Sequence, residues 1–508
     1  MATTTIDTFE GILKRYYLSE LEDQLNRDYL VLDLFQKEVV EWNGNMCVLF
    51  LRTGRNIGVG VSDDGSLPTA NSQETVKMQV RHKRIYGRIQ VDRAAMAAAE
   101  SKGVGAVISW ADLELDGCRN DVLNFTDRMT ISGGTCIGYI NEYKASNGTV
   151  GAAGVSANLP ADCGAAKDWE FSGEFTRLQA LALQPTDAAG ASWIRIKLIR
   201  MDTYEEVDVT GAPAAGLAGI FISGYDAAAS TLKLRFASDA AGDTFTTETS
   251  GGVTSAIGVA CAVVIHEVQG HDAVPTAPYQ GQSPAVFGFT GNTTSGYFTG
   301  TKHPEVTGIF GNLSLPELGG QTSIPGTGGV PRNDLATPDT YPVLKSNIMT
   351  ASTAGTATRV ALNASRMQEV LSEIRQKVGS RLAPDCLLMN YMQEATYVHL
   401  LIGNIASTNF TRKMASGNDV GVDVDTLKYG GIPIKSGQHV PKGMIIFLNL
   451  GSWSVLELGP GKWADDDGAV LSRVSGSDVY SAYYAWYMQL ICKHPNANGV
   501  LCGLSLTV

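Results

Sequence analysis

The stretch MCVLFLRTGRNIGVGV, residues 46–61, and its counterpart VKMQVRHKRIYGRIQV, residues 76–91, decide how the first part of this chain folds. Apolar residues recur at every second position, which is the period of a β-strand. These positions are Ile57, Val59, Val61, Val76, Met78, Val80, Ile85, Ile89 and Val91. Between them SDDGSLPTANS, residues 62–72, is a turn cluster. We therefore predict an extended β-hairpin loop over residues 46–92, which needs a surface to rest on because an isolated hairpin is marginally stable.

An amphipathic helix is expected in an N-terminal arm, residues 1–45. The segment FEGILKRYYLSELEDQLN, residues 9–26, has one apolar stripe at helical spacing. The stripe consists of Phe9, Ile12, Leu13, Tyr16, Tyr17 and Leu21. A helix of this length is marginal alone in water, so it must pack on its own domain or on a neighbouring subunit. The sequence leaves both possibilities open.

A second helix is predicted within residues 93–134, ending at Gly133-Gly134. It contains the acidic residues Asp112, Glu114, Asp116 and Asp121, whereas the return strand of the hairpin contains the basic residues Arg81, Lys83, Arg84 and Arg88. Opposite charges on two elements of one chain suggest an assembly contact between copies. Two solvated faces explain the pattern equally well.

The chain then becomes rich in Ala, Gly, Thr and Ser, and residues 135–285 are predicted to form an inserted β-rich domain, a sandwich or small barrel. Its clearest strands are SWIRIKLIRM, residues 192–201, and STLKLRF, residues 230–236. Residues 284–342 read as ordered loop, and residues 361–379 as an amphipathic helix. The fold class is therefore α+β.

Charge and composition exclude several functions for these 508 residues. With 39 Lys and Arg against 51 Asp and Glu, the net charge of −12 argues against nucleic-acid binding through overall charge. The longest apolar run, residues 256–265, is half of what a membrane span needs, and we expect a soluble protein without a secretory signal. The eight Cys form no C-x-x-C pair, so we expect no zinc ribbon or redox motif. The chain also lacks the nucleotide-binding patterns G-x-x-x-x-G-K-[ST] and G-x-G-x-x-G, and we expect no cofactor.

The string HEVQGH, residues 266–271, is the one enzyme-like motif. A zinc hydrolase of the H-E-x-x-H type places two His four residues apart on one helix face, but His266 and His271 are five apart. Because the string follows an apolar run and contains Gly270, we interpret it as the end of a strand. A metal hydrolase using His266 and His271 is therefore a disfavoured alternative.

The order of elements resembles the major capsid protein of tailed bacteriophages, with the Hong Kong 97-like fold. The resemblance rests on the arm, on the loop closing with KRIYGRIQVDRAAM, on the helix ending in ISGG, and on GYFTGTKHPEVTGIFGN, LKYGGIPIKSGQHVPKGMIIFLNL and CKHPNANGVLCGLSL. It covers residues 9–134 and 286–508. It implies that residues 93–134 form a peripheral domain with a spine helix, residues 286–450 an axial domain, and residues 451–508 the return strands of the peripheral domain.

The resemblance also implies a function, which is a non-enzymatic shell protein that self-assembles into hexamers and pentamers of an icosahedral phage head enclosing double-stranded DNA. Its expected partners are further copies of itself, a portal protein at one vertex and decoration proteins, with DNA enclosed without specific binding and no membrane. Because the arm begins by residue 9, we expect a separate scaffolding protein. The expected location is the virion, and the host cytoplasm during assembly. An extracellular β-rich adhesin or surface-layer protein is the main alternative.

Overall fold

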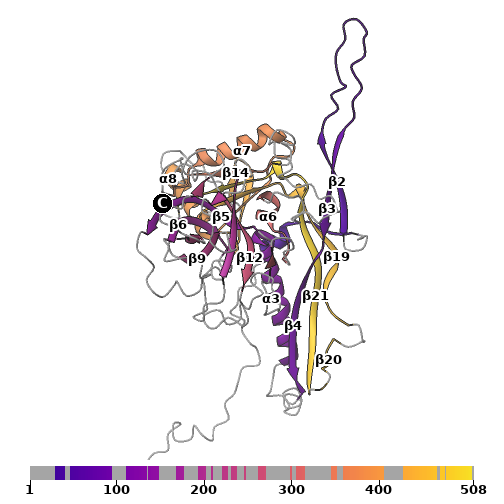
Figure 1. The fold of residues 1–508 in the computed structure, drawn as a ribbon, viewed down its shortest axis with the longest axis vertical. Coiled ribbons are helices and arrows are strands. Elements are labelled where there is room, and N and C mark those ends of the chain that lie inside the picture. Colours follow the sequence, from indigo (N-terminus) through magenta and orange to yellow (C-terminus); the bar gives the residue numbers. More distant parts are fainter. Residues whose placement is uncertain are drawn as a thin grey trace, which may run out of the picture. The chain divides into compact units, whose positions relative to one another are not determined.

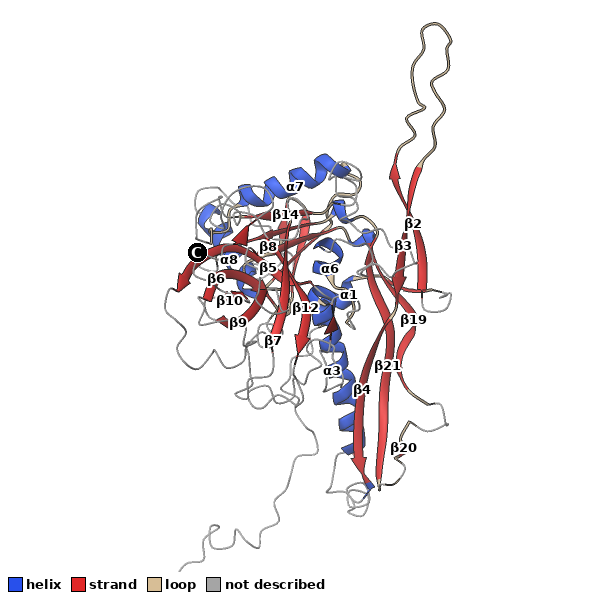
Figure 2. Cartoon of the chain, viewed as in Figure 1, coloured by secondary structure: helices blue, strands red, loops and turns tan. Residues whose placement is uncertain are grey.

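The computed structural model describes a large part of the chain. The described residues are 29–40, 46–93, 110–133, 136–147, 168–176, 193–201, 208–209, 220–226, 230–236, 245–246, 261–269, 298–299, 305–314, 345–351, 359–405, 427–465, 470–474, 476 and 478–505. They form two compact units, a smaller one drawn from residues 85–124 and 460–486 and a larger one drawn from residues 29–84, 125–459 and 487–508. Helices and strands are mixed, as Figure 2 shows, so the predicted α+β class is confirmed.

A six-stranded mixed sheet forms one layer of the larger unit. Its strands, in spatial order, are β14 (Asn347–Thr350), β22 (Gly499–Cys502), β18 (Ile445–Leu448), β15 (Cys386–Met389), β17 (Ile432–Ser436) and β16 (Lys428–Tyr429). Helices α7 (Ala364–Val378) and α8 (Tyr391–Ile405) pack against it (Figure 1), because Val370 and Tyr397 share one apolar cluster with Phe447. Helix α7 confirms the prediction for residues 361–379. It begins after Asn363, whose side chain accepts from the Ser365 N–H, and ends at Gly379.

A closed β-barrel is the second part of the larger unit. Six strands pair in the cyclic order β12, β5, β6, β10, β9 and β7, and β7 pairs with β12 again to close the ring. Their bounds are β5 Cys136–Asn147, β6 Asp168–Phe175, β7 Trp193–Arg200, β9 Ile220–Asp226, β10 Thr231–Phe236 and β12 Cys261–Gln269, and β13 (Phe298–Thr299) pairs with β12. The predicted strands over residues 192–201 and 230–236 are confirmed as β7 and β10. The small two-stranded sheet of β8 (Asp208–Val209) and β11 (Phe245–Thr246) lies in the same sequence region.

The barrel shares a core with residues beyond position 285. Helix α6 (Ile309–Ser314) is buried, and Phe310 packs edge to face on Tyr139 of β5 with ring centroids 5.0 Å apart. The expectation that residues 284–342 contain no regular element is therefore wrong at α6. The six residues are too few for a helical period to be seen in the sequence. The independence of residues 135–285 as an inserted domain stays a prediction.

A five-stranded sheet contains the long strands β4, β19 and β21. Its order is β1 (Lys37–Val39), β19 (Trp453–Trp463), β21 (Val479–Cys492) and β20 (Ser472–Arg473), and β4 (Lys83–Asp92) also pairs with β21. Short helices α1 (Leu30–Leu34), η7 (Leu450–Ser452) and η8 (Pro495–Ala497) complete the described elements together with α3 and the hairpin strands. Residues 451–508, which were predicted to form return strands, thus contain β19, β21 and β22.

Helix α3 (Trp110–Ser132) is the predicted second helix, and it ends where expected. The Gly133 N–H donates to the Met129 carbonyl at 2.9 Å, and the Gly308 N–H donates to the Gly133 carbonyl at 3.1 Å. A Cβ at Gly133 would collide with the Val306 carbonyl oxygen. Glycine is needed at this position because the segment around residue 306 passes directly against it.

The predicted hairpin over residues 46–92 requires a correction. Strands β2 (Met46–Gly54) and β3 (Glu74–Arg81) pair with each other, from Met46 opposite Arg81 to Gly54 opposite Glu74. Residues 83–92 form β4 in a different sheet, and residues 57–61 are loop. Gly58 and Gly60 weaken a strand and Pro68 cannot donate to a ladder, so the alternation of Ile57, Val59 and Val61 does not produce pairing.

Candidate assembly surfaces

The β2–β3 hairpin has one packed face and one exposed face. Cys47 and Val80 lie in an apolar cluster with Leu456 and Ile491, while Leu49 and Leu51 pack against its edge. Side chains alternate along a strand, so the residues between them point the other way. Val48 and Phe50 are accordingly 45% and 66% exposed. The hairpin is thus anchored on one side and carries uncovered apolar surface on the other.

The loop between these strands, residues 55–73, continues the hairpin as a narrow two-legged extension (Figure 1). A Cβ on Gly58 would lie 2.8 Å from the Thr69 carbonyl oxygen, so the legs approach closely there. At the turn, the Asp64 carboxylate accepts from the hydroxyl of Ser66 at 2.6 Å and from that of Ser62 at 2.7 Å. These hydrogen bonds, led by the one from Ser66, lower the pKa of Asp64. The loop therefore has internal order although it is exposed.

Exposed apolar side chains concentrate on this hairpin and loop. Of the twelve large hydrophobic residues that are exposed in the described part of the chain, six lie between positions 48 and 67. They are Val48, Phe50, Ile57, Val59, Val61 and Leu67. Scattered single exposed residues are normal, but a series on one protruding element is typical of an interaction surface. Sequence reasoning had placed five of these residues in a strand and Leu67 in the turn, and had not counted them as assembly contacts.

The predicted basic cluster divides between two faces of the chain. Along β4 the burial alternates, so that Arg84 and Arg88 are exposed while Ile85 and Ile89 are buried. Lys83 lies on the same face of β4 as Ile85 and Ile89 and is half-buried. Arg81, at the end of β3, is also half-buried. Burial lowers the pKa of Lys83 to about 8. The positive charge of Arg81 adds to this shift, whereas the negative charge of Glu305 opposes it. Arg81, Lys83, Arg84 and Arg88 therefore do not form one patch.

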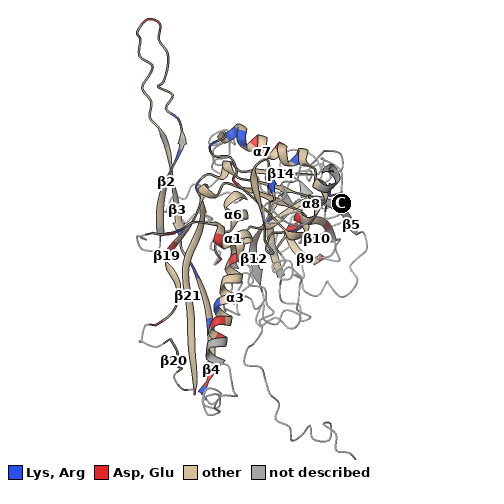
Figure 3. Cartoon of the chain, turned by 180° about the vertical axis from the view of Figure 1, so that it is seen from behind, with Lys and Arg blue, Asp and Glu red and all other residues tan. Residues whose placement is uncertain are grey.

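The predicted acidic residues lie on α3, and the smaller unit contains the relevant part of this helix. Asp116 and Asp121 are exposed and Glu114 is half-buried, whereas the side chain of Asp112 lies outside the described residues. On the same helix Leu115 and Cys118 pack against a cluster formed by Ile89, Val91 and Ala482. Figure 3 shows the charged segments along α3 and β4. The helix thus packs one side on β4 and presents acidic residues elsewhere.

The arm residues Phe9, Ile12, Leu13, Tyr16, Tyr17 and Leu21 lie outside the described residues. Their predicted role in assembly stays a prediction.

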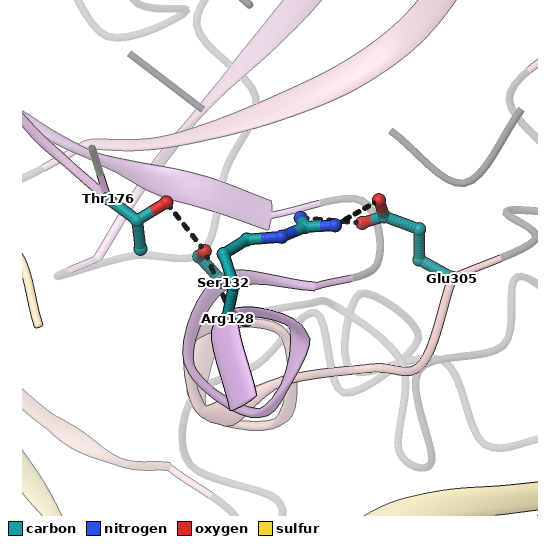
Figure 4. Close-up of polar contacts among 4 residues, drawn as sticks. All are labelled: Arg128, Ser132, Thr176 and Glu305. Atoms are coloured by element: carbon teal, nitrogen blue, oxygen red, sulfur yellow. Dashed lines mark hydrogen bonds and ion pairs between the residues drawn. The ribbon is translucent and has the colours of Figure 1, made fainter. Parts of the chain in front are cut away.

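A buried ion pair that sequence reasoning missed fixes the C-terminal half of α3 within the larger unit. Both side chains are fully buried, and Figure 4 shows the Arg128 guanidinium donating to both carboxylate oxygens of Glu305, at 2.6 and 3.1 Å. Close by, the Ser132 hydroxyl donates to Thr176 at 3.4 Å, and the Asp127 carboxylate accepts from the Leu32 N–H at 2.7 Å. Because Arg128 and Glu305 are 177 positions apart, no local sequence pattern could have shown that they meet.

The enzyme-like string takes the predicted form of a strand end. His266 lies in β12, so it cannot belong to a helix-face zinc site, and His271 lies outside the described residues. Within the ranges given above, no three His, Cys, Asp or Glu side chains come close enough to hold a metal ion.

Among the helices of the described residues, none combines the length and the apolar character that crossing a bilayer requires.

No protein-family model matches the chain, and no curated protein matches it. The search of solved structures returned phage-type capsid chains among its matches. A chain of the Cyanophage A-1(L) capsid asymmetric unit is 12% identical with a TM-score of 0.49, covering 99% of both chains. A chain of the capsid of the native GTA particle is 7% identical with a TM-score of 0.44, covering 99% of this chain and all of the other. A chain of the satellite phage P4 procapsid is 7% identical with a TM-score of 0.38, and the match covers 98% of this chain and 96% of the other.

Proposed function

We propose that this chain is a major capsid protein of a tailed bacteriophage, a structural protein that self-assembles into hexamers and pentamers of an icosahedral head around double-stranded DNA. The observation that carries the proposal is the β2–β3 hairpin, which exposes six large apolar side chains along β2 and its internally ordered loop. A monomeric protein has no use for such an element, whereas a neighbouring subunit can cover it.

The order of elements supports the same function. The anchored hairpin is followed by the long helix α3, and the helix-covered sheet of α7 and α8 comes later in the chain. This is the order that the resemblance to the Hong Kong 97-like family implies for the extended loop, the spine helix and the axial domain. A scaffolding protein, a portal protein and decoration proteins are the further partners in this proposal, and the virion is the location.

The hairpin provides a direct test. In the variant Ile57→Ser, Val59→Ser, Val61→Ser the subunit should keep its fold, because these side chains are 79–105% exposed. Each would contribute up to about 1.5–3 kcal/mol if a neighbour covered it fully. We expect the unchanged chain to form closed shells or rings in negative-stain images, and the variant to remain as folded single subunits.

The matched control is Val39→Ser, which changes a 71% exposed valine outside the hairpin. It should assemble like the unchanged chain. Normal shells from the triple variant would show that the hairpin is not an assembly element. An unchanged chain that stays dispersed at high concentration, with scaffolding protein supplied, would refute the capsid function itself.

A further inference from the structure

The loop between β2 and β3 carries an alternating row of side chains along its first leg. Every second residue from position 55 to position 63 is charged or large and apolar, and the residues between them are small or polar. All members of the row are exposed. We call this series the outward row, and it consists of Arg55, Ile57, Val59, Val61 and Asp63.

The two glycines of this leg show which way the outward row points. A Cβ on Gly58 would lie 2.8 Å from the Thr69 carbonyl oxygen, and one on Gly60 would lie 3.4 Å from the Pro68 Cβ, so both positions face the opposite leg of the loop. In extended backbone, successive side chains point to opposite sides. The three apolar members of the outward row therefore point away from the opposite leg, which explains their exposure.

The outward row ends in two opposite charges. Arg55 lies at the base of the loop and Asp63 at its tip (Figure 3). Among the residues that the structure describes, neither side chain has a hydrogen-bond or ion-pair partner. The two residues are eight positions apart, which is about 26 Å in extended backbone, so they cannot pair with each other. Each charge therefore needs a partner from outside the subunit.

Turned end for end, the outward row is complementary to itself. In an antiparallel copy centred on Val59, the valine meets its own counterpart and Ile57 meets Val61. Arg55 of each copy then meets Asp63 of the other, so each contact contains two ion pairs. A parallel copy would instead place each charge beside a like charge, which is unfavourable. The order of the residues thus favours one arrangement of two copies.

We propose that the outward rows of two copies pack antiparallel about a twofold axis at Val59, an inference that rests on the proposed function. The occupant is a second copy because the charges and apolar residues of the row match their own reversed order. Such a contact is isologous, whereas contacts within a ring of more than two copies are heterologous. In a shell, the contact therefore joins a subunit of one ring to a subunit of the next.

Apolar and charged residues have different tasks in this contact. Three apolar side chains from each copy become covered, and this supplies most of the attraction. Exposed ion pairs contribute little individually and are screened by salt. The charged ends mainly select the antiparallel arrangement over the parallel one.

Single cysteines in the full chain test the twofold axis. Assembled chains with Val59→Cys, Ile57→Cys or Val61→Cys are treated with a short bifunctional maleimide, and crosslinked dimers are measured on denaturing gels. Val59→Cys should crosslink to itself, because the axis places the two introduced thiols opposite each other. Ile57→Cys alone should not, since its counterpart is displaced by four positions, about 13 Å along the strand. A mixture of Ile57→Cys and Val61→Cys chains should crosslink.

Two controls accompany the crosslinking. The unchanged chain measures the background from native thiols, and Val39→Cys places a thiol at an exposed valine outside the loop. Neither should form the dimer. Self-crosslinking of Ile57→Cys as strong as that of Val59→Cys would show a parallel arrangement and overturn the proposal. Shells of normal yield without a Val59→Cys crosslink would overturn the contact while leaving the shell function intact.

Charge exchange tests the orientation independently. The variants are Arg55→Asp, Asp63→Arg and the two together. Light scattering measures the threshold concentration for self-association at low salt and at about 0.5 M salt. Each single reversal places like charges together twice in a contact, so it should raise the threshold about three- to tenfold at low salt and much less at high salt. The double variant should return to within about twofold of the unchanged chain, because opposite charges meet again.

The matched control for the reversals is Arg381→Asp, which changes an exposed arginine just after α7. It should leave the threshold within about twofold. Single reversals that act no more strongly than this control, or a double variant as poor as the worse single one, would overturn the contact but not the shell function. Failure of the unchanged chain to associate under any condition would overturn both.

Discussion

Glu174 shows at the scale of one residue how burial changes the chemistry of a side chain. It is 1% exposed in β6, and the Arg359 guanidinium lies 2.9 Å from its carboxylate. Desolvation raises the pKa of Glu174 to about 8, and Arg359 offsets this only in part. Cys502, whose own pKa is raised by burial, lies in the same region. The carboxyl is therefore protonated in the folded chain at pH values where an unfolded chain has lost that proton.

This difference predicts a pH-dependent stability. Between pH 4.5, the ordinary value, and about 8, the folded state binds more protons at Glu174 than the unfolded state, so stability falls as pH rises through this window. Glu174→Gln removes the titration. We expect the stability of the Gln variant relative to the unchanged chain to increase by a few kcal/mol between pH 5 and pH 8, measured by urea unfolding of unassembled subunits.

The control is Glu369→Gln on α7, where the carboxylate pairs with Arg366 at the surface. Its stability difference should stay flat within about 0.5 kcal/mol over the same range. A flat profile for Glu174→Gln as well would show that the folded chain carries an ionised Glu174.

At the scale of elements, Gly87 determines how closely β4 and α3 approach. The contacts of a Cβ placed there, with Val122 and Cys118, are shorter than side chains tolerate. A side chain at this position would push the helix away from the strand and disturb the cluster of Ile89, Val91 and Ala482. The packing of β4 on α3 therefore requires glycine at this position, although a glycine inside a strand weakens the strand.

We predict that Gly87→Ala destabilises the subunit by about 1–3 kcal/mol, the usual cost of overpacking. Combining it with Cys118→Ala should recover part of the loss, because that change removes one of the two colliding atoms. Chemical unfolding measures both. Gly117→Ala is the matched control, since nothing lies within 4 Å of its Cβ position in α3 and the substitution should stabilise the helix by up to about 1 kcal/mol. If Gly87→Ala left the stability unchanged, α3 would be able to shift away from β4 without a loss of stability.

At the scale of the whole molecule, the proposed shell requires apolar surfaces that become covered only when copies meet. The exposed face of the hairpin is one of them. The N-terminal arm is a second candidate, because its apolar stripe from Phe9 to Leu21 needs a surface to cover it.

Deleting residues 1–25 should therefore separate folding from assembly. We expect subunits that still unfold cooperatively in urea at the midpoint of the unchanged chain, and a loss of closed shells in electron micrographs. If the stripe packs only within its own subunit, the truncated chain will instead lose stability in urea before assembly is affected. Shells of normal yield and heat resistance from the truncated chain would contradict a role for the arm.

The sequence by itself determined those features that depend on neighbours along the chain. Helix α7 follows from an apolar period and a capping Asn363, the end of α3 follows from Gly133, and strands β7 and β10 follow from alternation. The resemblance to tailed-phage capsid proteins likewise came from the order of such local elements. Local periodicity suffices for these because the backbone sets which side chains share a face.

Only the tertiary structure decided what distant residues do together. It showed that Arg84 and Arg88 face away from α3 while Lys83 does not, that Arg128 pairs with Glu305, and that β12 closes a barrel by pairing with both β5 and β7. It also showed that Ile57, Val59 and Val61 alternate without being paired in a strand. Strand pairing and ion pairing depend on which surfaces become buried against each other, and that depends on the whole folded chain, whereas periodicity reports only what one segment favours.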